Sequence, residues 1–175
     1  VIKQGDEGDF FYIITAGTCA VTRETPLNRD GIRLAELAAG DTFGEEALIT
    51  ESKRNATVSM LTSGKVMRLS KANFQVLLKE PSIERVDYSE AQVIIANGGK
   101  WLDARLPSEF EPSHQAGAIN IPLYVIRLKL GNLDPDTQYV VYCDTGRRSS
   151  AAAFILIEKG FNACVLQDGT KRVDA

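Results

Sequence analysis

The sequence of 175 residues is poor in the residues that build disulfide scaffolds and histidine-based metal sites. Its three cysteines are too few for a disulfide framework, so we expect a reducing, cytoplasmic setting. The single histidine, His114, argues against a His-based metal site and a Cys–His dyad, and we expect no metal. No apolar run approaches the roughly 20 residues needed to cross a bilayer, so we expect no membrane partner.

An excess of charge of one sign is also lacking. Lysine plus arginine number 20 and aspartate plus glutamate 23, which gives a net charge of −3. A protein that binds nucleic acid through a basic face needs an excess of positive charge, so we expect no nucleic-acid partner. Hydrophobic residues make up 44% of the chain, enough for a globular core, and this excludes a disordered chain. The length allows one large domain or two small ones.

The first half of the chain is a series of short β-prone runs separated by turn residues. Phe10–Ile14 and Thr18–Thr22 flank Gly17, which predicts a hairpin. Many short strands at close spacing predict an antiparallel all-β jelly roll or barrel. A short helix is predicted at Lys71–Leu78, with Ser70 as its N-cap. The remaining β-prone runs are Ile32–Leu37, Ala56–Leu61 and Lys65–Leu69.

From about Asp87 the pattern changes to alternating strands and helices. Ser89–Ala96 resembles a helix, Gln138–Tyr142 is a fully apolar strand core, Ser149–Lys159 predicts a helix, and Phe161–Leu166 predicts the next strand. Strand, loop, helix and strand in this order predict an α/β domain in which helices flank a parallel sheet.

The boundary between the two halves is expected at residues 81–88, where Pro81 follows the predicted helix. We therefore expect a β domain at residues 1–84 and an α/β domain at residues 85–175. Their net charges, −1 for residues 1–86 and −2 for residues 87–175, do not distinguish them.

One chemical constellation lies in the β domain, where Phe43–Ile49 (Phe-Gly-Glu-Glu-Ala-Leu-Ile) is followed by Arg54-Asn55-Ala56-Thr57. Gly44 lets the backbone approach a ligand closely, and a helical turn that starts there offers N–H groups to an anion. The planar guanidinium of Arg54 suits a phosphate, and Glu45 supplies acceptors for a sugar hydroxyl. Together these residues predict a site for a cyclic phosphodiester on a ribose.

This segment resembles the phosphate-binding cassette of cyclic nucleotide-binding domains, Phe-Gly-Glu-x-Ala-Leu, a spacer and Arg-x-Ala-Thr, and the resemblance covers about residues 1–80. It implies that Glu45 binds the ribose 2′-hydroxyl and Arg54 the cyclic phosphate, with cAMP favoured over cGMP. The alternative is a fold that binds no nucleotide, with Arg54 on a solvated loop. The candidate nucleotide-binding residues are Gly44, Glu45, Glu46, Ala47, Arg54 and Asn55.

The sequence departs from the cassette pattern at two of these positions. Glu46 replaces an aliphatic residue, and a second carboxylate so near a phosphate is unfavourable unless it points to solvent. Asn55 replaces a small residue or threonine. Val1–Gly5 already falls within the motif of the barrel, so we expect a leading helix and strand to precede the sequence given.

A second constellation, Cys143–Arg148 (Cys-Asp-Thr-Gly-Arg-Arg), joins a predicted strand to a predicted helix. It therefore lies at the carboxyl end of a parallel strand, where open α/β sheets bind ligands. Helix N-termini and cations, here Arg147 and Arg148, stabilise a thiolate. Such a nucleophile can attack phosphorus, arsenic or sulfur. Four residues separate Cys143 from Arg148, one fewer than in the phosphatase loop, and the tighter ring favours a sulfane sulfur.

The second half resembles the rhodanese domain, a sulfurtransferase family, over about residues 86–170. The resemblance implies that Cys143 accepts a sulfur atom as a persulfide, that loop N–H groups stabilise it, and that Arg147 and Arg148 hold the donor, unless one of them binds a core carboxylate. Asp144 is expected to raise the pKa of Cys143. The candidate catalytic residues are Cys143, Asp144, Thr145, Gly146, Arg147 and Arg148. The matching motifs are Trp101–Phe110, His114–Pro122, Cys143–Arg148 and Val165–Gly169.

The other reactive residue types have structural explanations. Asp103 and Arg105 are expected to form a structural ion pair at a strand end. By resemblance to the family, His114 anchors a loop. Cys19 and Cys164 are expected to be small buried residues, with a resolving role for Cys164 as the alternative.

The hypothesis is a bacterial-style cytoplasmic sulfurtransferase that senses a cyclic nucleotide. It takes sulfur from thiosulfate, a persulfide or a polysulfide and passes it to a thiol or cyanide, and its catalysis requires no cofactor. Regulatory proteins of this type are often dimers, so a homodimer is one expected state. Two alternatives stay open: a sensor or interaction module whose rhodanese domain is not catalytic, and a Cys-dependent phosphatase or arsenate reductase.

Overall fold

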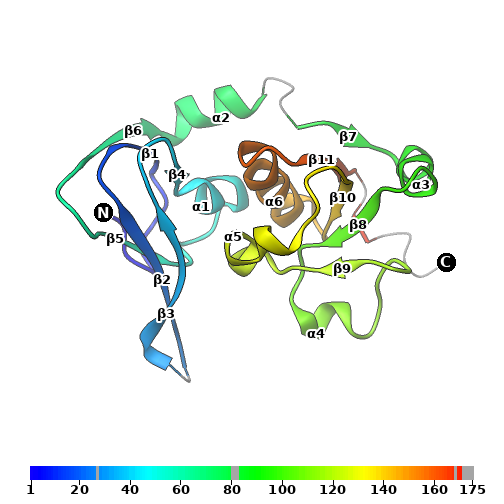
Figure 1. Ribbon diagram of the computed structural model, residues 1–175, viewed down its shortest axis with the longest axis horizontal. Helices are drawn as coiled ribbons and strands as arrows, with labels where there is room; N and C mark the ends of the chain where they lie inside the picture. Colours follow the sequence, from blue (N-terminus) through cyan, green and yellow to red (C-terminus); the bar gives the residue numbers. More distant parts are fainter. Residues whose placement is uncertain (27, 80–82, 168, 171–175) are drawn as a thin grey trace. The chain divides into compact units, whose positions relative to one another are not determined.

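The computed structural model describes residues 1–26, 28–79, 83–167 and 169–170. The chain divides into two compact units, Val1–Glu80 and Pro81–Ala175, and each is described by itself (Figure 1). Pro81, at the expected domain boundary, and Asp168, within the Val165–Gly169 motif, lie outside the described residues. No helix among the described residues is long and apolar enough to span a membrane.

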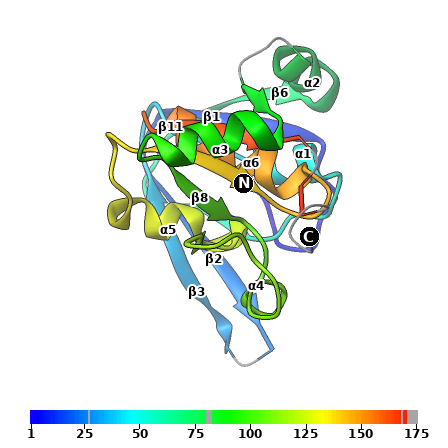
Figure 2. The same cartoon turned by 90° about the vertical axis from the view of Figure 1, so that its right-hand side faces the viewer.

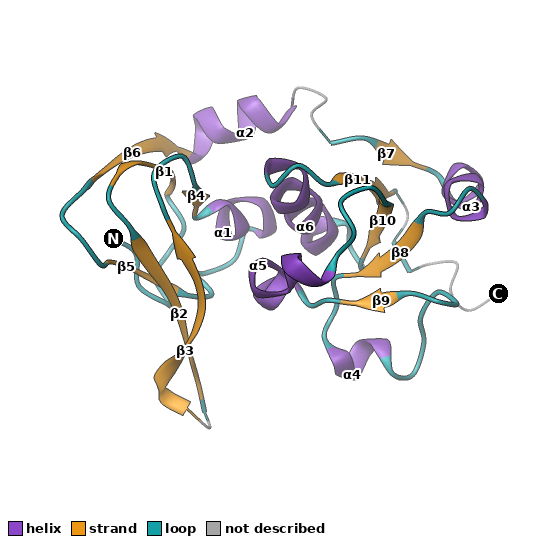
Figure 3. Cartoon of the chain, in the orientation of Figure 1, coloured by secondary structure: helices purple, strands orange, loops and turns teal. Residues whose placement is uncertain are grey.

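The first unit consists mainly of two antiparallel sheets of three strands each, and the predicted all-β fold is confirmed (Figure 3). One sheet has the order β4-β1-β6 and the other β3-β2-β5. The strands are β1 (Phe10–Ala16), β2 (Cys19–Thr25), β3 (Asn28–Leu37), β4 (Thr42–Phe43), β5 (Thr57–Met60) and β6 (Lys65–Ser70).

The predicted hairpin between the first two strands is wrong. The strands β1 and β2 lie in different sheets: β1 pairs with β4 and β6, whereas β2 pairs with β3 and β5. The physical reason is that the apolar residues of β1 and β2 pack between the two sheets. By crossing from one sheet to the other after Gly17, the chain buries Ile14 and Val21 in a single core cluster. The same cluster takes residues from β3, β4 and β5.

Two short helices complete the first unit. Helix α1 (Glu45–Thr50) follows β4, and α2 (Lys71–Lys79) follows β6. The predicted N-cap of the second helix is confirmed, because the Asn73 N–H donates to Ser70 Oγ at 3.4 Å. Phe74 of α2 is buried and stacks on Phe11 with 4.6 Å between ring centroids, which fixes this helix on β1.

The second unit has a five-stranded parallel sheet of order β7-β11-β10-β8-β9, as the strand–helix alternation predicted. Its central strand β10 coincides with the predicted run Gln138–Tyr142, and Tyr139 to Tyr142 are buried because the sheet is covered on both faces. The other strands are β7 (Arg85–Val86), β8 (Lys100–Asp103), β9 (Ile119–Asn120) and β11 (Asn162–Leu166).

Helices lie on both faces of this sheet. Helix α3 (Tyr88–Ala96) covers one face and α6 (Arg147–Glu158) the other (Figures 1 and 2). The short helices α4 (Pro107–Phe110) and α5 (Ile126–Lys129) lie between β8 and β10 in the sequence. Helix α6 begins at Arg147, two residues before the predicted start, because Gly146 caps it. The loop after β10 therefore runs directly into the N-terminus of a helix.

Candidate functional site

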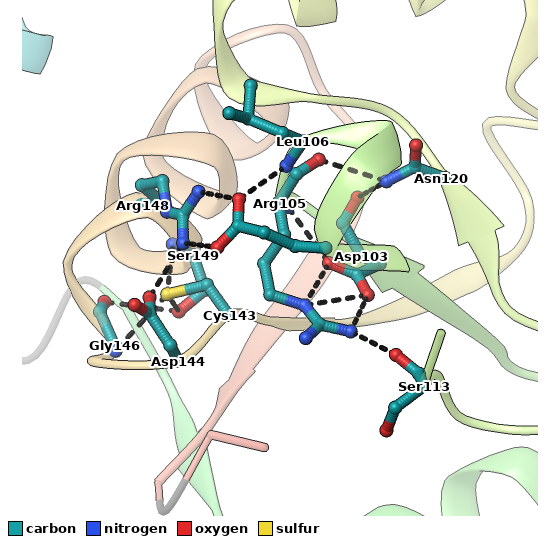
Figure 4. Close-up of polar contacts among 11 residues, drawn as sticks. Asp103, Arg105, Leu106, Ser113, Asn120, Cys143, Asp144, Gly146, Arg148 and Ser149 are labelled. Carbon is teal, nitrogen blue, oxygen red and sulfur yellow. Dashed lines mark hydrogen bonds and ion pairs between the residues drawn. The ribbon is translucent and has the colours of Figure 1, made fainter. Parts of the chain in front are cut away.

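Cys143 lies directly after β10, at the N-terminus of α6, and its side chain is fully buried. The backbone N–H groups of Gly146 and Ser149 donate to its Sγ atom at 3.2 and 3.3 Å (Figure 4). The thiol also contacts Ser149 Oγ at 3.4 Å. Two N–H donors and the positive end of a helix dipole favour a negative charge on this sulfur.

The shape of the loop depends on two glycines. Gly146 has a φ of 81°, a left-handed conformation that lets the chain turn into α6 within one residue. At Gly169 a Cβ atom would lie 2.3 Å from the carbonyl oxygen of Cys143, so only glycine fits beneath the loop. The conformation of the cysteine loop therefore depends on one glycine within the loop and on another, Gly169, that follows β11.

Arg148 fastens this loop to α4. Its guanidinium donates to the two carboxylate oxygens of Glu109 at 2.6 and 2.7 Å and to Asp144 at 2.9 Å (Figure 4). The Arg148 hydrogen bond lowers the pKa of Glu109, and the two carboxylates raise the pKa of Arg148. Arg148 is thus bound to carboxylates, one of the two roles that the sequence left open for these arginines.

Asp144 faces Arg148, although it follows the sulfur directly in sequence. Burial alone would raise the pKa of Asp144, but the Arg148 hydrogen bond and charge outweigh it and hold that pKa below its usual range. Its negative charge is therefore balanced within the loop. Thr145 and Arg147 are exposed, so the outer rim of the loop carries a hydroxyl and a guanidinium.

A second ion pair, between Asp103 and Arg105, lies at the end of β8. Arg105 donates to both oxygens of Asp103 at 2.8 to 3.1 Å and to the carbonyl of Ser113, and Asp103 is fully buried (Figure 4). The predicted structural ion pair at the strand end is confirmed. His114 bonds the carbonyl of Phe110 through Nδ1 at 2.8 Å, which agrees with its expected role as a loop anchor.

The two other cysteines are buried, as predicted. Cys164 pairs with Val140 in the sheet, three residues before Cys143, and its thiol points to the carbonyl of Tyr139. Burial raises the pKa of Cys164 to about 11, so little thiolate forms at neutral pH. Neither observation favours a resolving role. Cys19 packs against Met60 in the core of the first unit.

The predicted nucleotide cassette occupies β4, α1 and the loop before β5. Arg54 is buried, and its guanidinium donates to the carbonyls of Gly44 at 2.7 Å and Phe10 at 2.6 Å. A Cβ on Gly44 would lie 2.9 Å from this guanidinium, so the close approach requires glycine. Glu45 is buried too. Burial lowers the pKa of Arg54, and the charges of Asp9, Glu45 and other neighbours oppose this only in part.

The side chain of Glu46 does not meet the condition of pointing to solvent. Its carboxylate accepts a hydrogen bond from the Asn55 amide at 2.5 Å, and both side chains are half-buried. The two departures from the cassette pattern therefore explain each other, because the acid at one position binds the amide at the other. Ala47 is buried and lies next to Gly8.

A pocket of about 120 Å³ lies beside Arg54. Among the described residues, Arg54 is the one candidate nucleotide-binding residue that lines it, together with Phe10, Tyr12 and the acids Asp6, Glu7 and Asp9. Across residues 1–26, 28–79, 83–167 and 169–170, no group of three or more His, Cys, Asp or Glu side chains could hold a metal ion.

Sequence reasoning missed several residues that the structure brings to the cysteine loop. Glu109 lay within a recognised motif but was not assigned to the site, and Ser149 was counted only as the start of a helix. A carboxylate that binds the loop arginine and a hydroxyl beside the sulfur are both expected of such a loop. The distance of 39 residues between Glu109 and Arg148 hides the first from local patterns.

Comparison with known proteins finds two families in this order along the chain. Residues 1–80 match the model of the cyclic nucleotide-binding domain, and residues 87–175 match that of the rhodanese-like domain. Similar to the second part is the thiosulfate sulfurtransferase PspE of Escherichia coli (strain K12), 36% identical over 75 residues, which are 42% of this chain and 72% of that protein.

Two relatives match the first part. The cGMP-dependent protein kinase, isozyme 1, of Drosophila melanogaster is 36% identical over 93 residues, which are 51% of this chain and 12% of the kinase. The cAMP-dependent protein kinase regulatory subunit of Yarrowia lipolytica is 42% identical over 78 residues, 45% of this chain and 20% of that subunit. The chain thus spans only a small part of these two relatives.

Proposed function

The chain belongs to the rhodanese-like family through residues 87–175, with a cyclic nucleotide-binding domain before them, and we propose that it is a sulfurtransferase that carries a sulfane sulfur on Cys143. The observation that carries the proposal is the pair of N–H groups, from Gly146 and Ser149, that donate to the sulfur at the start of α6. They lower the free energy of the thiolate that attacks the donor and of the persulfide anion that results.

The first step forms the persulfide. The Cys143 thiolate attacks the outer sulfur of thiosulfate, a new S–S bond forms, and the bond between the two sulfurs of thiosulfate breaks. Sulfite leaves with the electron pair of that bond, so no external oxidant or reductant is needed. A persulfide donor reacts in the same way with a thiolate as the leaving group, and a polysulfide donor with a polysulfide one sulfur shorter as the leaving group.

The second step returns the enzyme to its starting state. A thiolate or cyanide attacks the outer sulfur of the persulfide and forms an acceptor persulfide or thiocyanate. The S–S bond to Cys143 breaks, and its electron pair restores the Cys143 thiolate. Catalysis needs no cofactor in this scheme.

The loop side chains divide into two groups in this proposal. Arg147 and Thr145 stand on the exposed rim and meet the incoming donor. Arg148 holds the loop against Glu109 and balances the charge of Asp144. In the loop held in this way, the Gly146 N–H donates to the sulfur. An anionic donor therefore meets the positive charge of Arg147 first.

Mass spectrometry of the intact protein after treatment with thiosulfate or polysulfide tests this function. We expect wild type to gain the mass of one sulfur atom and Cys143→Ser to gain none. The matched control is Cys164→Ser, which removes a buried thiol of the same unit and should still gain sulfur. If wild type gains no sulfur from any donor, the proposal is wrong, and turnover of an aryl phosphate by Cys143 would favour a phosphatase instead.

We propose further that residues 1–80 bind a cyclic nucleotide, cAMP in preference to cGMP, and that this binding regulates sulfur transfer. The supporting observation is that the buried guanidinium of Arg54 donates to backbone carbonyls, which are uncharged, next to the buried Glu45. In the bound state Arg54 holds the cyclic phosphate, Glu45 the ribose 2′-hydroxyl, and the backbone of Gly44, Ala47 and Asn55 completes the cradle.

Calorimetric titration with cAMP and cGMP tests the binding. Wild type should bind cAMP more tightly than cGMP, and Glu45→Gln should weaken both, because an amide is a poorer acceptor for the ribose hydroxyl than a carboxylate. No heat with either nucleotide in wild type would contradict the proposal. The cytoplasmic, bacterial setting and the homodimer stay predictions.

A further inference from the structure

A chain of hydrogen bonds joins β7 to the cysteine loop. Arg85 Nη2 donates to Ser150 Oγ at 3.0 Å, and Ser150 Oγ donates to the carbonyl oxygen of Gly146 at 2.7 Å. The N–H of the same glycine donates to Cys143 Sγ at 3.2 Å. An exposed residue at the edge of the sheet is thus connected to the reactive sulfur through a single buried serine.

The direction of this chain follows from the chemistry of its members. A guanidinium has donors and no acceptor, so Ser150 must accept from Arg85 and use its one hydrogen for Gly146. The positive charge polarises the hydroxyl and strengthens the second bond. Replacing either side chain therefore weakens the hold on the glycine carbonyl.

The carbonyl oxygen of Gly146 accepts several hydrogen bonds at the start of α6. It also accepts the Ser150 N–H at 3.0 Å and Ser149 Oγ at 3.1 Å. Because the peptide group is planar and trans, fixing this carbonyl also fixes the Arg147 N–H, which points in the opposite direction, out of the N-terminus of α6. A glycine backbone rotates easily, so the Ser150 hydroxyl adds to these hydrogen bonds in restraining the Gly146 backbone.

We propose that Arg85 is a positioning residue for Cys143 and acts through Ser150 on the Gly146 peptide group. The inference rests on the persulfide chemistry proposed for Cys143 and assigns it a residue outside the loop. Arg85 lies in a two-residue strand that is held to β11 by bonds to the carbonyls of Glu84 at 2.9 Å and Val86 at 3.0 Å. Among the described residues, this strand is the first element of the second unit.

The kinetic signature of a positioning residue differs from that of a binding residue. Arg85 acts through Ser150 on the carbonyl of Gly146, the residue whose own N–H donates to the Cys143 sulfur, so its loss should lower kcat. It does not touch the donor, so KM should stay the same. Losing one hydrogen bond to a charged group predicts a fall of about tenfold in kcat for sulfur uptake.

The test measures sulfur uptake by Cys143 over a range of thiosulfate concentrations in Arg85→Met, Ser150→Ala and the double variant. Each single variant should lose about tenfold in kcat with KM within about twofold of wild type, and the double variant should lose no more than either single one. Arg85→Lys, which keeps a charged donor, should recover part of the rate. Glu84→Gln, an exposed neighbour, is the matched control and should behave as wild type.

Two outcomes overturn the inference: an Arg85→Met variant with the wild-type kcat, or losses in the single variants that multiply in the double variant. A failure of the proposed function looks different, because wild type then takes up no sulfur. In that case the inference is tested by the rate at which iodoacetamide alkylates Cys143, with the modified residue identified by peptide mass. It should be slower in Arg85→Met than in Glu84→Gln, and equal rates overturn the inference. Urea unfolding of each variant separates these rates from a loss of folded protein.

Discussion

The two sites each depend on an arginine, and the two arginines are held in different ways. Arg54 of the cassette donates to two uncharged backbone carbonyls, and burial lowers its pKa. Arg148 of the cysteine loop donates to the carboxylates of Glu109 and Asp144, which raise its pKa. A guanidinium held by carbonyls keeps its positive charge for an anionic ligand, whereas one held by two carboxylates is balanced and fastens a loop.

The largest effect is expected on cAMP affinity when Arg54, the first of the two compared arginines, is replaced. Arg54→Lys should weaken cAMP binding about 30-fold, because a lysine cannot hold both carbonyls and a phosphate in one plane. Calorimetry measures this effect, with Arg29→Ala on the exposed part of β3 as the matched control. Binding by Arg54→Lys as tight as that of wild type would show that this guanidinium does not meet the phosphate.

The next effect is on the stability of the second unit. Arg148→Lys should lower the free energy of unfolding by about 1–2 kcal/mol, since the paired bonds to Glu109 and the bond to Asp144 cannot all be kept by one ammonium group. Urea unfolding measures the change. The same variant should take up sulfur more slowly, because the loop is no longer fastened to α4. An unchanged unfolding midpoint would mean that Arg148 is not structural.

The pH dependence of the free energy of unfolding tests Glu109, the carboxylate partner of Arg148. The Arg148 hydrogen bond lowers the pKa of Glu109 below its unfolded value of 4.5. The ion pair therefore stabilises the fold above that pH and loses this effect as the pH falls through the lower folded value. Glu109→Gln should cost about 0.5–1 kcal/mol at neutral pH, after allowance for solvent, and less in acid.

Urea unfolding of wild type and Glu109→Gln at several pH values measures this difference. Glu111→Gln, an exposed acid two residues further on, is the matched control and should show no such trend. A cost of Glu109→Gln that stays constant down to acid pH would contradict the ion pair.

The smallest effect is expected at Glu46, an acid inside the cassette. Its carboxylate binds the Asn55 amide, so Glu46→Gln should leave cAMP affinity within about twofold of wild type. Glu45→Gln at the adjacent position should weaken it clearly. Equal losses in the two variants would mean that Glu46 faces the ligand after all, and the contrast between the two acids would then fail.

Local patterns predicted most of the fold and part of the sites. The apolar run Gln138–Tyr142, the loop after it and the following strand were read correctly because each is set by neighbouring residues. The hairpin at Gly17 was wrong because which strands pair depends on how two apolar faces meet, and that is a tertiary property.

The partners of the loop residues could not be predicted for the same reason. Arg85 and Ser150 are 65 residues apart in sequence, and Glu109 and Arg148 are 39 apart. The contact between Glu46 and Asn55 was also not predicted, because the two residues are nine apart and Asn55 stands where the cassette pattern has a small residue. Sequence alone proposed Cys143 as the nucleophile and Arg54 as the phosphate-binding arginine, but it did not predict the groups that hold them.

The central claim is that one chain joins a cyclic nucleotide site to a sulfur-transferring cysteine. The most direct test is the rate of sulfur uptake by Cys143 from thiosulfate with and without cAMP, in wild type and in Arg54→Lys. We predict that cAMP changes the rate in wild type and has no effect, at the same concentration, in Arg54→Lys. A wild-type rate that stays the same while calorimetry shows cAMP to be bound would contradict the claim.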